Sequence, residues 1–241
     1  MQVVFCRKKA AESIKNIVAF CIGIVILALG VSSPFIYSTV KYANSPTVVI
    51  DAGHGGEDGG VSGARTGVKE SDLNLKISKL LGEYLKSAGF RVVYTRTNDV
   101  MLKYHKNVGT KKRADMFRRG EIINKTAPDA VVSIHMNYYT SSTRRGAQVF
   151  FDNSSEKGRE FANIMQEVVN DGVNSIGGGR RYSALSAEKY LLSCSPYPTV
   201  IVECGFLSNP FDEANLCDAQ YQAKLAYVLF EGIAIFLSAR A

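Results

Sequence analysis

Short runs of β-branched and aromatic residues alternate with helical patterns along most of this chain, and this alternation constrains its fold more than any other feature. Strand-like runs occupy residues 47–51, 90–95, 130–135, 147–151 and 199–203. Helical patterns occupy residues 71–88, 110–126, 156–171 and 218–239, and loops are expected at 97–109 and 173–190. Strands that alternate with helices build a layered α/β domain. We therefore predict a mixed, largely parallel central sheet flanked by helices on both faces.

The N-terminal part has a different pattern, because no charged residue occurs between Lys15 and Lys41. This stretch is long enough to cross a bilayer, which takes ~20 residues. A basic cluster precedes it, so the positive-inside rule places the remainder of the chain outside the membrane. We predict a cytoplasmic segment at 1–16, a transmembrane signal-anchor or signal peptide at 17–40, a linker at 41–46 and a folded domain at 47–241. The domain is secreted if the N-terminal helix is cleaved.

Charge and cysteine content exclude several kinds of partner and site. The formal net charge is +7, of which residues 1–41 carry +4 (five basic residues and one acid), so the domain is only mildly basic. No nucleic-acid motif accompanies that charge, and we expect no nucleic-acid binding. The domain holds three cysteines, none in a CxxC pair, which disfavours a thiolate zinc site. One disulfide or three free thiols both remain open.

Two histidines and two glutamates of the domain are candidate functional residues, because each lies at or near the end of a predicted strand or the start of a predicted helix. His54 and His135 each follow or end a predicted strand, at the sheet edge where sites of α/β proteins assemble. Glu70 begins a predicted helix, and Glu203 ends a strand of buried type, where a carboxylate is costly unless it is paired or bound to a metal. Two histidines and one glutamate are a common zinc set, although a histidine on an apolar strand is more often a core residue. Cys204, beside Glu203, leaves a cysteine hydrolase as an alternative.

Four segments, in this order along the chain, favour the zinc site over core histidines and over a cysteine hydrolase. They are VVIDAGHGGEDGG, GVKESDLNL, VVSIHMN and VIVECGFLSNP. Together they resemble the signature of the zinc-dependent N-acetylmuramoyl-L-alanine amidases known as amidase type 3, over residues 47–238. The resemblance implies a zinc-exopeptidase-like fold and one Zn²⁺ held by His54, Glu70 and His135, with Glu203 as the catalytic glutamate. The implied reaction cleaves the amide between N-acetylmuramic acid and L-alanine in peptidoglycan. Met136 stands where the family usually has alanine.

The expected organisation, a catalytic domain behind an anchor without a wall-binding repeat, is similar to that of spore-cortex amidases. These remove stem peptides so that muramic-δ-lactam can form. The implied location is the extracytoplasmic face of a bacterial membrane, with the forespore intermembrane space as one such place, and an envelope activator protein is a plausible partner. Arg180 and Arg181 are predicted to grip carboxylates of the stem peptide. Two alternatives stay open: a zinc peptidase acting on another amide, and a membrane-tethered wall-binding or scaffold protein whose metal site is weak or activated by a partner.

Overall fold

The computed structural model describes residues 45–177 and 180–239. The predicted cytoplasmic segment, the transmembrane helix and residues 41–44 of the linker lie outside the described residues, so these predictions remain untested. Within the described residues, no helix combines the length and the apolar character that a bilayer crossing needs.

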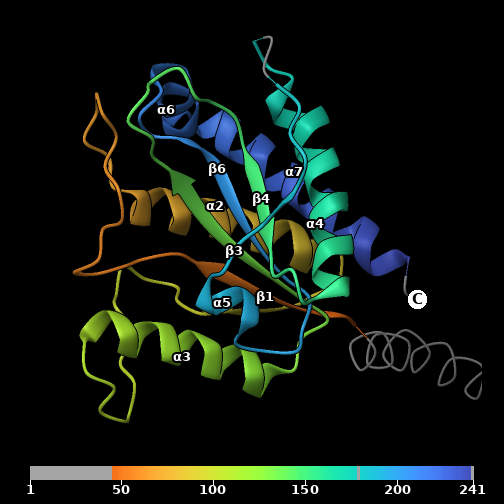
Figure 1. Ribbon diagram of the computed structural model, residues 1–241. Coiled ribbons are helices and arrows are strands. Elements are labelled where there is room, and N and C mark those ends of the chain that lie inside the picture. Colours follow the sequence, from red (N-terminus) through yellow and green to blue (C-terminus); the bar gives the residue numbers. More distant parts are fainter. Residues whose placement is uncertain (1–44, 178–179, 240–241) are drawn as a thin grey trace, which may run out of the picture. The chain divides into compact units, whose positions relative to one another are not determined.

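Six strands form one sheet in the order β2-β1-β3-β6-β4-β5 (Figure 1). Their bounds are Thr47–Ala52 for β1, Arg91–Tyr94 for β2, Ala130–Asn137 for β3, Gln148–Phe151 for β4, Leu185–Ser186 for β5 and Thr199–Phe206 for β6. Strands β2, β1, β3 and β6 run parallel, whereas β4 pairs antiparallel with β6 and β5 follows β4 in parallel. The carboxyl ends of β1, β3 and β6 therefore meet at one edge of the sheet. The predicted mixed, largely parallel sheet is confirmed.

Helices cover both faces of the sheet, because its central strands are buried on both sides. The helical elements are α2 (Glu70–Ser87), α3 (Lys111–Thr126), α4 (Glu156–Val169), α5 (Tyr190–Ser193), α6 (Pro210–Cys217) and α7 (Ala219–Ser238), and a π-helical turn, η1 (Asn170–Asn174), extends α4. One face packs against α2, α4 and α7, where Leu81, Met165 and Leu229 are fully buried. The other face packs against α3 and α5 through Ile123 and Leu191. The predicted helical layers are confirmed.

Three short elements were not expected from the sequence. Strand β5 and helix α5 both fall within or at the end of the stretch that we predicted as a loop at 173–190. Helix α6 precedes α7, and the side chain of Asn209 caps it by accepting from the backbone N–H groups of Phe211 and Asp212. The helix predicted at 71–88 begins one residue earlier, at Glu70, and no side chain caps its first turn.

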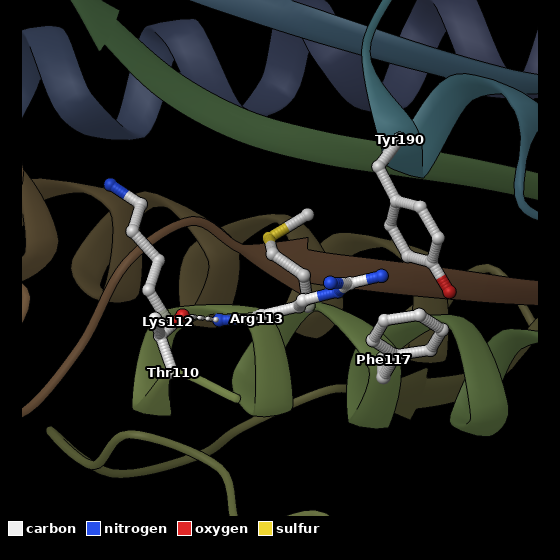
Figure 2. A pocket seen from close by; sticks show the side chains of 6 residues that line it. Thr110, Lys112, Arg113, Phe117 and Tyr190 are labelled. Carbon is white, nitrogen blue, oxygen red and sulfur yellow. Dashed lines mark hydrogen bonds between the residues drawn. The ribbon is translucent and has the colours of Figure 1, made fainter. Parts of the chain in front are cut away.

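Two cavities lie along the same side of the sheet. One, of about 440 Å³, is found at the carboxyl ends of β1, β3 and β6 and contains both predicted histidines. The second, of about 410 Å³, lies between α3 and α5 (Figure 2). Lys112 lines both cavities, so they are neighbours.

Candidate metal centre

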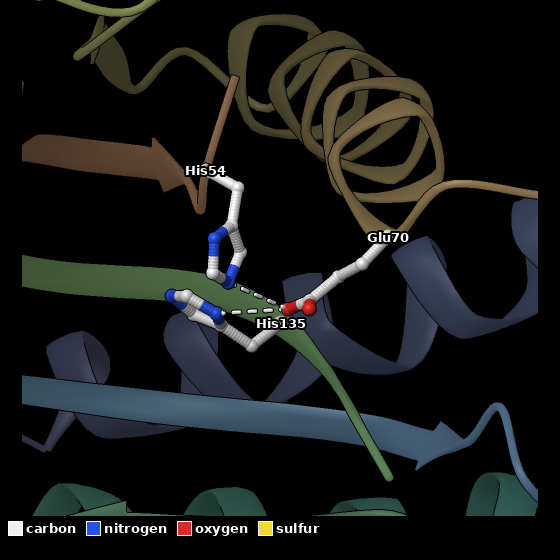
Figure 3. Close-up of side chains that lie close together, drawn as sticks. All are labelled: His54, Glu70 and His135. Carbon is white, nitrogen blue, oxygen red and sulfur yellow. Dashed lines mark hydrogen bonds and ion pairs between the residues drawn. The ribbon is translucent and has the colours of Figure 1, made fainter. Parts of the chain in front are cut away.

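Three distant segments bring His54, Glu70 and His135 together, as Figure 3 shows. The carboxylate Oε1 of Glu70 lies 3.2 Å from Nε2 of His54 and 3.0 Å from Nδ1 of His135. One donor atom from each side chain can be chosen so that all three lie within 4.8 Å of one another. The two imidazole rings stand nearly perpendicular, with centroids 5.1 Å apart. The arrangement presents two nitrogen donors and one oxygen donor to a common point.

The backbone holds Glu70 in this position from both sides. Its side chain is almost fully buried, and Oε1 accepts a hydrogen bond from the backbone N–H of Met136 at 3.0 Å. The other oxygen, Oε2, accepts from the backbone N–H of Val61 at 3.0 Å. Asn74, one turn along α2, donates to the backbone oxygen of Gly53 at 3.1 Å and so ties the helix to the loop that carries His54. The carboxylate is thus oriented before any ligand binds.

The loop after β1 adopts an uncommon backbone conformation at His54, whose φ is +59°. A non-glycine residue in the left-handed region is held there by its surroundings. Gly53, just before it, leaves room for the ring of His135, because a Cβ at this position would lie 2.3 Å from Cε1 of that ring. Nδ1 of His54 lies 3.0 Å from Oδ2 of Asp58, which orients the ring from the solvent side.

Two buried arginines, which the sequence did not single out, bind the backbone of the loop that carries His54. Arg119 donates to the backbone oxygens of Ala52 at 2.8 Å and His54 at 2.6 Å. Arg96 donates to the backbone oxygens of Ala52 and Gly53, both at 2.8 Å. Only 1% of Arg119 and 3% of Arg96 is exposed. These two side chains therefore hold the loop that carries His54 through its carbonyl groups.

Arg119 is buried together with the acids that balance its charge. Its Nη1 donates to Asp51 Oδ1 and its Nε donates to Asp115 Oδ2, each at 2.6 Å. Asp51 also accepts from the hydroxyls of Thr95 and Ser133. Burial would raise the pKa of Asp51, but Arg119 and the two hydroxyls lower it to about 2. The ion pair therefore stays charged across the physiological range.

Glu203 lines the same cavity as His54, Glu70 and His135. It is the register partner of His135 in the β3–β6 pair, and both residues line the 440 Å³ cavity. Its Oε2 is buried and has no hydrogen-bond partner among the described residues. Burial raises the pKa of Glu203 above its usual value. A buried carboxylate with an unused oxygen beside a donor cluster is suited to proton transfer.

The side chains of Glu70 and His54 each favour the charged form of the other. Burial opposes the charged form of Glu70, but the two imidazoles hold its pKa well below the usual range. Burial likewise opposes protonation of His54, yet Glu70 and Asp58 raise its pKa. The site therefore attracts positive charge, whether this is a proton or a cation.

The two arginines predicted to bind substrate are not brought to this cavity. Arg181 forms ion pairs with Glu167 at the end of α4 and with Asp171 in η1, and Arg180 is exposed. Neither lines the cavity, whose polar rim instead includes Lys112 and Lys189. No sequence pattern had distinguished these lysines from other surface residues. The role predicted for Arg180 and Arg181 stays a prediction.

The cysteine alternative has little support in this environment. Cys194, Cys204 and Cys217 are all free thiols. Cys204 is buried, and burial together with the Glu203 charge raises the pKa of its thiol. A nucleophilic cysteine needs the opposite, an accessible thiol with a lowered pKa.

Comparisons with known proteins agree on one kind of enzyme. The family described as N-acetylmuramoyl-L-alanine amidase matches residues 48–235. The chain is 30% identical over 189 residues to the germination-specific N-acetylmuramoyl-L-alanine amidase of Bacillus subtilis, covering 77% of each protein. It is similar in structure to the CwlD amidase from Clostridioides difficile in complex with the GerS lipoprotein, with a TM-score of 0.74, 33% identity and coverage of 81% of this chain and 100% of that one. An N-acetylmuramoyl-L-alanine amidase from Clostridium difficile 630 gives a TM-score of 0.73 at 28% identity, covering 82% of this chain and 100% of that one.

Proposed function

The chain belongs to the N-acetylmuramoyl-L-alanine amidase family and is a cell-wall amidase, and we propose that it works with one zinc ion held by His54, Glu70 and His135. The observation that carries this proposal is the convergence of these three side chains, beside an unpartnered buried oxygen of Glu203. The zinc peptidase and scaffold alternatives predict no cleavage between muramic acid and L-alanine. The family membership supports that cleavage.

The donor set fits zinc in kind and in spacing. Zinc in proteins binds histidine nitrogen and carboxylate oxygen at about 2.0–2.2 Å, and catalytic sites use three protein ligands with the fourth position open. Ligands at that distance in tetrahedral geometry lie roughly 3.3 Å apart, close to the 3.0 and 3.2 Å between the Glu70 oxygen and the two ring nitrogens. A zinc ion bound there would polarise the amide carbonyl and acidify a water molecule.

Glu203 would carry the protons of the reaction. Its carboxylate would take a proton from the water as the water oxygen bonds to the carbonyl carbon. As the carbon–nitrogen bond breaks, the carboxyl group would deliver this proton to the amine nitrogen of L-alanine. Its raised pKa supports both steps, because an acid–base group works best when its pKa approaches the operating pH.

The role of Glu203 is tested by Glu203→Gln in the purified protein. We expect kcat to fall by roughly 10²–10⁴-fold, the usual contribution of general acid–base catalysis, with zinc content unchanged. Glu156→Gln, an exposed change at the start of α4, serves as the control and should keep normal turnover. Near-normal turnover of a folded, zinc-loaded Glu203→Gln protein would remove Glu203 from this role.

The bond that is cleaved is tested with purified peptidoglycan. Mass spectrometry of the products, with and without added zinc, should find free stem peptides that begin with L-alanine, together with peptide-free glycan. Fragments cut within the peptide would instead support the peptidase alternative. Products that form equally well after chelation would contradict the zinc proposal.

We further propose that this enzyme acts in spore cortex maturation, at the extracytoplasmic face of the membrane, where it removes stem peptides so that muramic-δ-lactam can form. Similarity to a germination-specific amidase and to CwlD supports this role. CwlD was solved with a lipoprotein, which supports an envelope lipoprotein as an activating partner here. Deletion of the gene should leave spores whose cortex lacks muramic-δ-lactam, as measured by chromatography of digested cortex. A cortex with normal lactam content would contradict the spore role.

A further inference from the structure

The second cavity borders the proposed active site and has a composition of its own. Two turns of α3 and the first residue of α5 form its walls, as Figure 2 shows. The lining residues are Thr110, Lys112, Arg113, Met116, Phe117 and Tyr190. Most of this surface is apolar, and the two cationic side chains come from consecutive positions of α3.

The two cavities are neighbours. Lys112 lines both of them, and Lys189, which lines the active-site cavity, immediately precedes Tyr190 in the second. A linear substrate bound in the first cavity therefore has the second cavity beside it, at the side chain of Lys112. An extended peptide advances about 3.5 Å per residue, so a cavity that borders the site is within reach of the residues next to the cleaved bond.

Arg113 is the charged group of this cavity that has no acid to balance it. Its guanidinium carbon lies 5.5 Å from the ring centroid of Phe117, and the rings of Phe117 and Tyr190 lie 5.3 Å apart. Within residues 45–177 and 180–239, no carboxylate forms an ion pair with Arg113, whereas the neighbouring Lys112 pairs with Asp58 at 3.3 Å. An arginine stacked on an aromatic ring keeps its planar N–H groups oriented for a bidentate acceptor.

We propose that this cavity binds the stem peptide of the substrate, with the Arg113 guanidinium on a carboxylate of the residue that follows L-alanine and the rings of Phe117 and Tyr190 against its aliphatic part. The inference rests on the proposed amidase function. Charge decides which half of the substrate fits: the N-acetylated glycan carries no charge near the cleaved amide, whereas the peptide carries carboxylates. Lys112, Lys189 and Arg113 line the path with positive charge.

The test compares two synthetic N-acetylmuramoyl-L-alanyl substrates that differ in one group. In the first, γ-linked D-glutamate with a free carboxylate follows L-alanine, and in the second this carboxylate is a carboxamide. We expect the wild type to prefer the carboxylate about tenfold in kcat/KM, the size of one charge-assisted hydrogen-bond pair. Arg113→Gln should abolish this preference by raising KM for the carboxylate substrate alone, with kcat unchanged. Arg113→Lys should restore part of it.

Arg118→Gln, which alters an arginine of the same helix that pairs with Glu121 outside the cavity, should keep the full preference. A tenfold preference that survives Arg113→Gln would overturn the proposal. Phe117→Leu should raise KM equally for both substrates, because they share the aliphatic part on which the ring packs. An unchanged KM for both would remove the rings from the proposed site.

A binding measurement keeps this proposal separate from the amidase function. L-Alanyl-D-glutamate whose γ-carboxyl is blocked as an amide, so that only the α-carboxylate is free, is titrated into protein labelled with ¹⁵N at arginine side chains. In the amidated dipeptide the α-carboxyl is an amide as well. A shift of the Arg113 Nε signal that is absent with the amidated dipeptide supports the site, even if neither substrate is cleaved. An unmoved Arg113 signal at saturating dipeptide would overturn the site, while cleavage of both substrates would leave the amidase function standing.

Discussion

Replacement of Arg119 by methionine should destabilise the protein far more than its position on a surface helix suggests. The side chain is 1% exposed and donates to two buried aspartates and to the backbone oxygens of Ala52 and His54. Methionine leaves Asp51 and Asp115 buried without their cation. Removal of one partner from a buried ion pair costs about 3–5 kcal/mol. This is a large part of the ~5–15 kcal/mol that stabilises a typical domain.

The stability lost in Arg119→Met should depend on pH, because Arg119 lowers the pKa of Asp51. The pKa of Asp51 is about 2 in the folded protein and 3.8 ordinarily, so its ionised form contributes about 2 kcal/mol at pH values above the ordinary pKa. That contribution is lost as pH falls from 3.8 to about 2. In Arg119→Met, burial raises the pKa of Asp51 instead, so the charged carboxylate destabilises the fold at neutral pH. The stability gap between wild type and variant should therefore narrow as the solution is acidified.

Urea unfolding at pH 7 and at lower pH, with the slope m compared between proteins, measures both effects. Arg118→Met is the matched control, because Arg118 is partly exposed and its pairing with Glu121 is worth less than about 1 kcal/mol. Arg119→Lys keeps the positive charge but loses the planar guanidinium, so its loss of unfolding free energy should lie between those of Arg118→Met and Arg119→Met. A loss below about 1 kcal/mol for Arg119→Met at unchanged m would refute the reasoning.

Three further predictions follow from the same site. Gly53→Ala should weaken zinc binding about 10–100-fold in calorimetry, because the added Cβ would lie 2.3 Å from the His135 ring. Gly59→Ala is the control and should bind zinc normally, because its Cβ would meet only a flexible lysine side chain at 3.3 Å. His135→Ala should lose most of its zinc by atomic absorption, and unchanged stoichiometry would exclude this histidine as a ligand. Prolonged chelation should abolish turnover and lower Tm, and added zinc should restore both, because a ligand that binds only the folded state stabilises it. Unchanged activity after verified metal removal would contradict the zinc mechanism.

The fold was largely predictable because its signal is local. Central strands buried on both faces require continuous β-branched runs such as Thr47–Ala52, and the helices that cover them require apolar residues at helical spacing. The elements β5, α5 and α6 were not predicted, because two to eight residues are too few to show a helical or strand-like pattern of apolar residues. The start of α6 had a readable signal in Asn209 and Pro210, a cap followed by proline at the first helical position.

Four ordered motifs indicated the candidate site, and strand order explains why they meet. His54 follows β1, and His135 and Glu203 lie within the last four residues of β3 and β6. These three strands are neighbours in the sheet and run parallel, so the side chains share one edge. The sequence alone determined which residue types are present and that they lie at strand ends or a helix start. Only the tertiary structure decided that Glu70 reaches both imidazoles, because that contact joins segments 16 and 65 residues apart.

Arginine roles were decided entirely by tertiary structure. Arg96, Arg113, Arg119 and Arg181 look alike in the sequence, yet Arg119 is buried under the His54 loop, while Arg181 pairs with acids on the protein surface. A guanidinium has no preferred environment of its own: its hydrogen bonds and its burial depend on which carbonyls and carboxylates distant segments bring within reach. The local pattern determined the strands, the helices and the candidate donors, and long-range packing determined which charged side chains hold them in place.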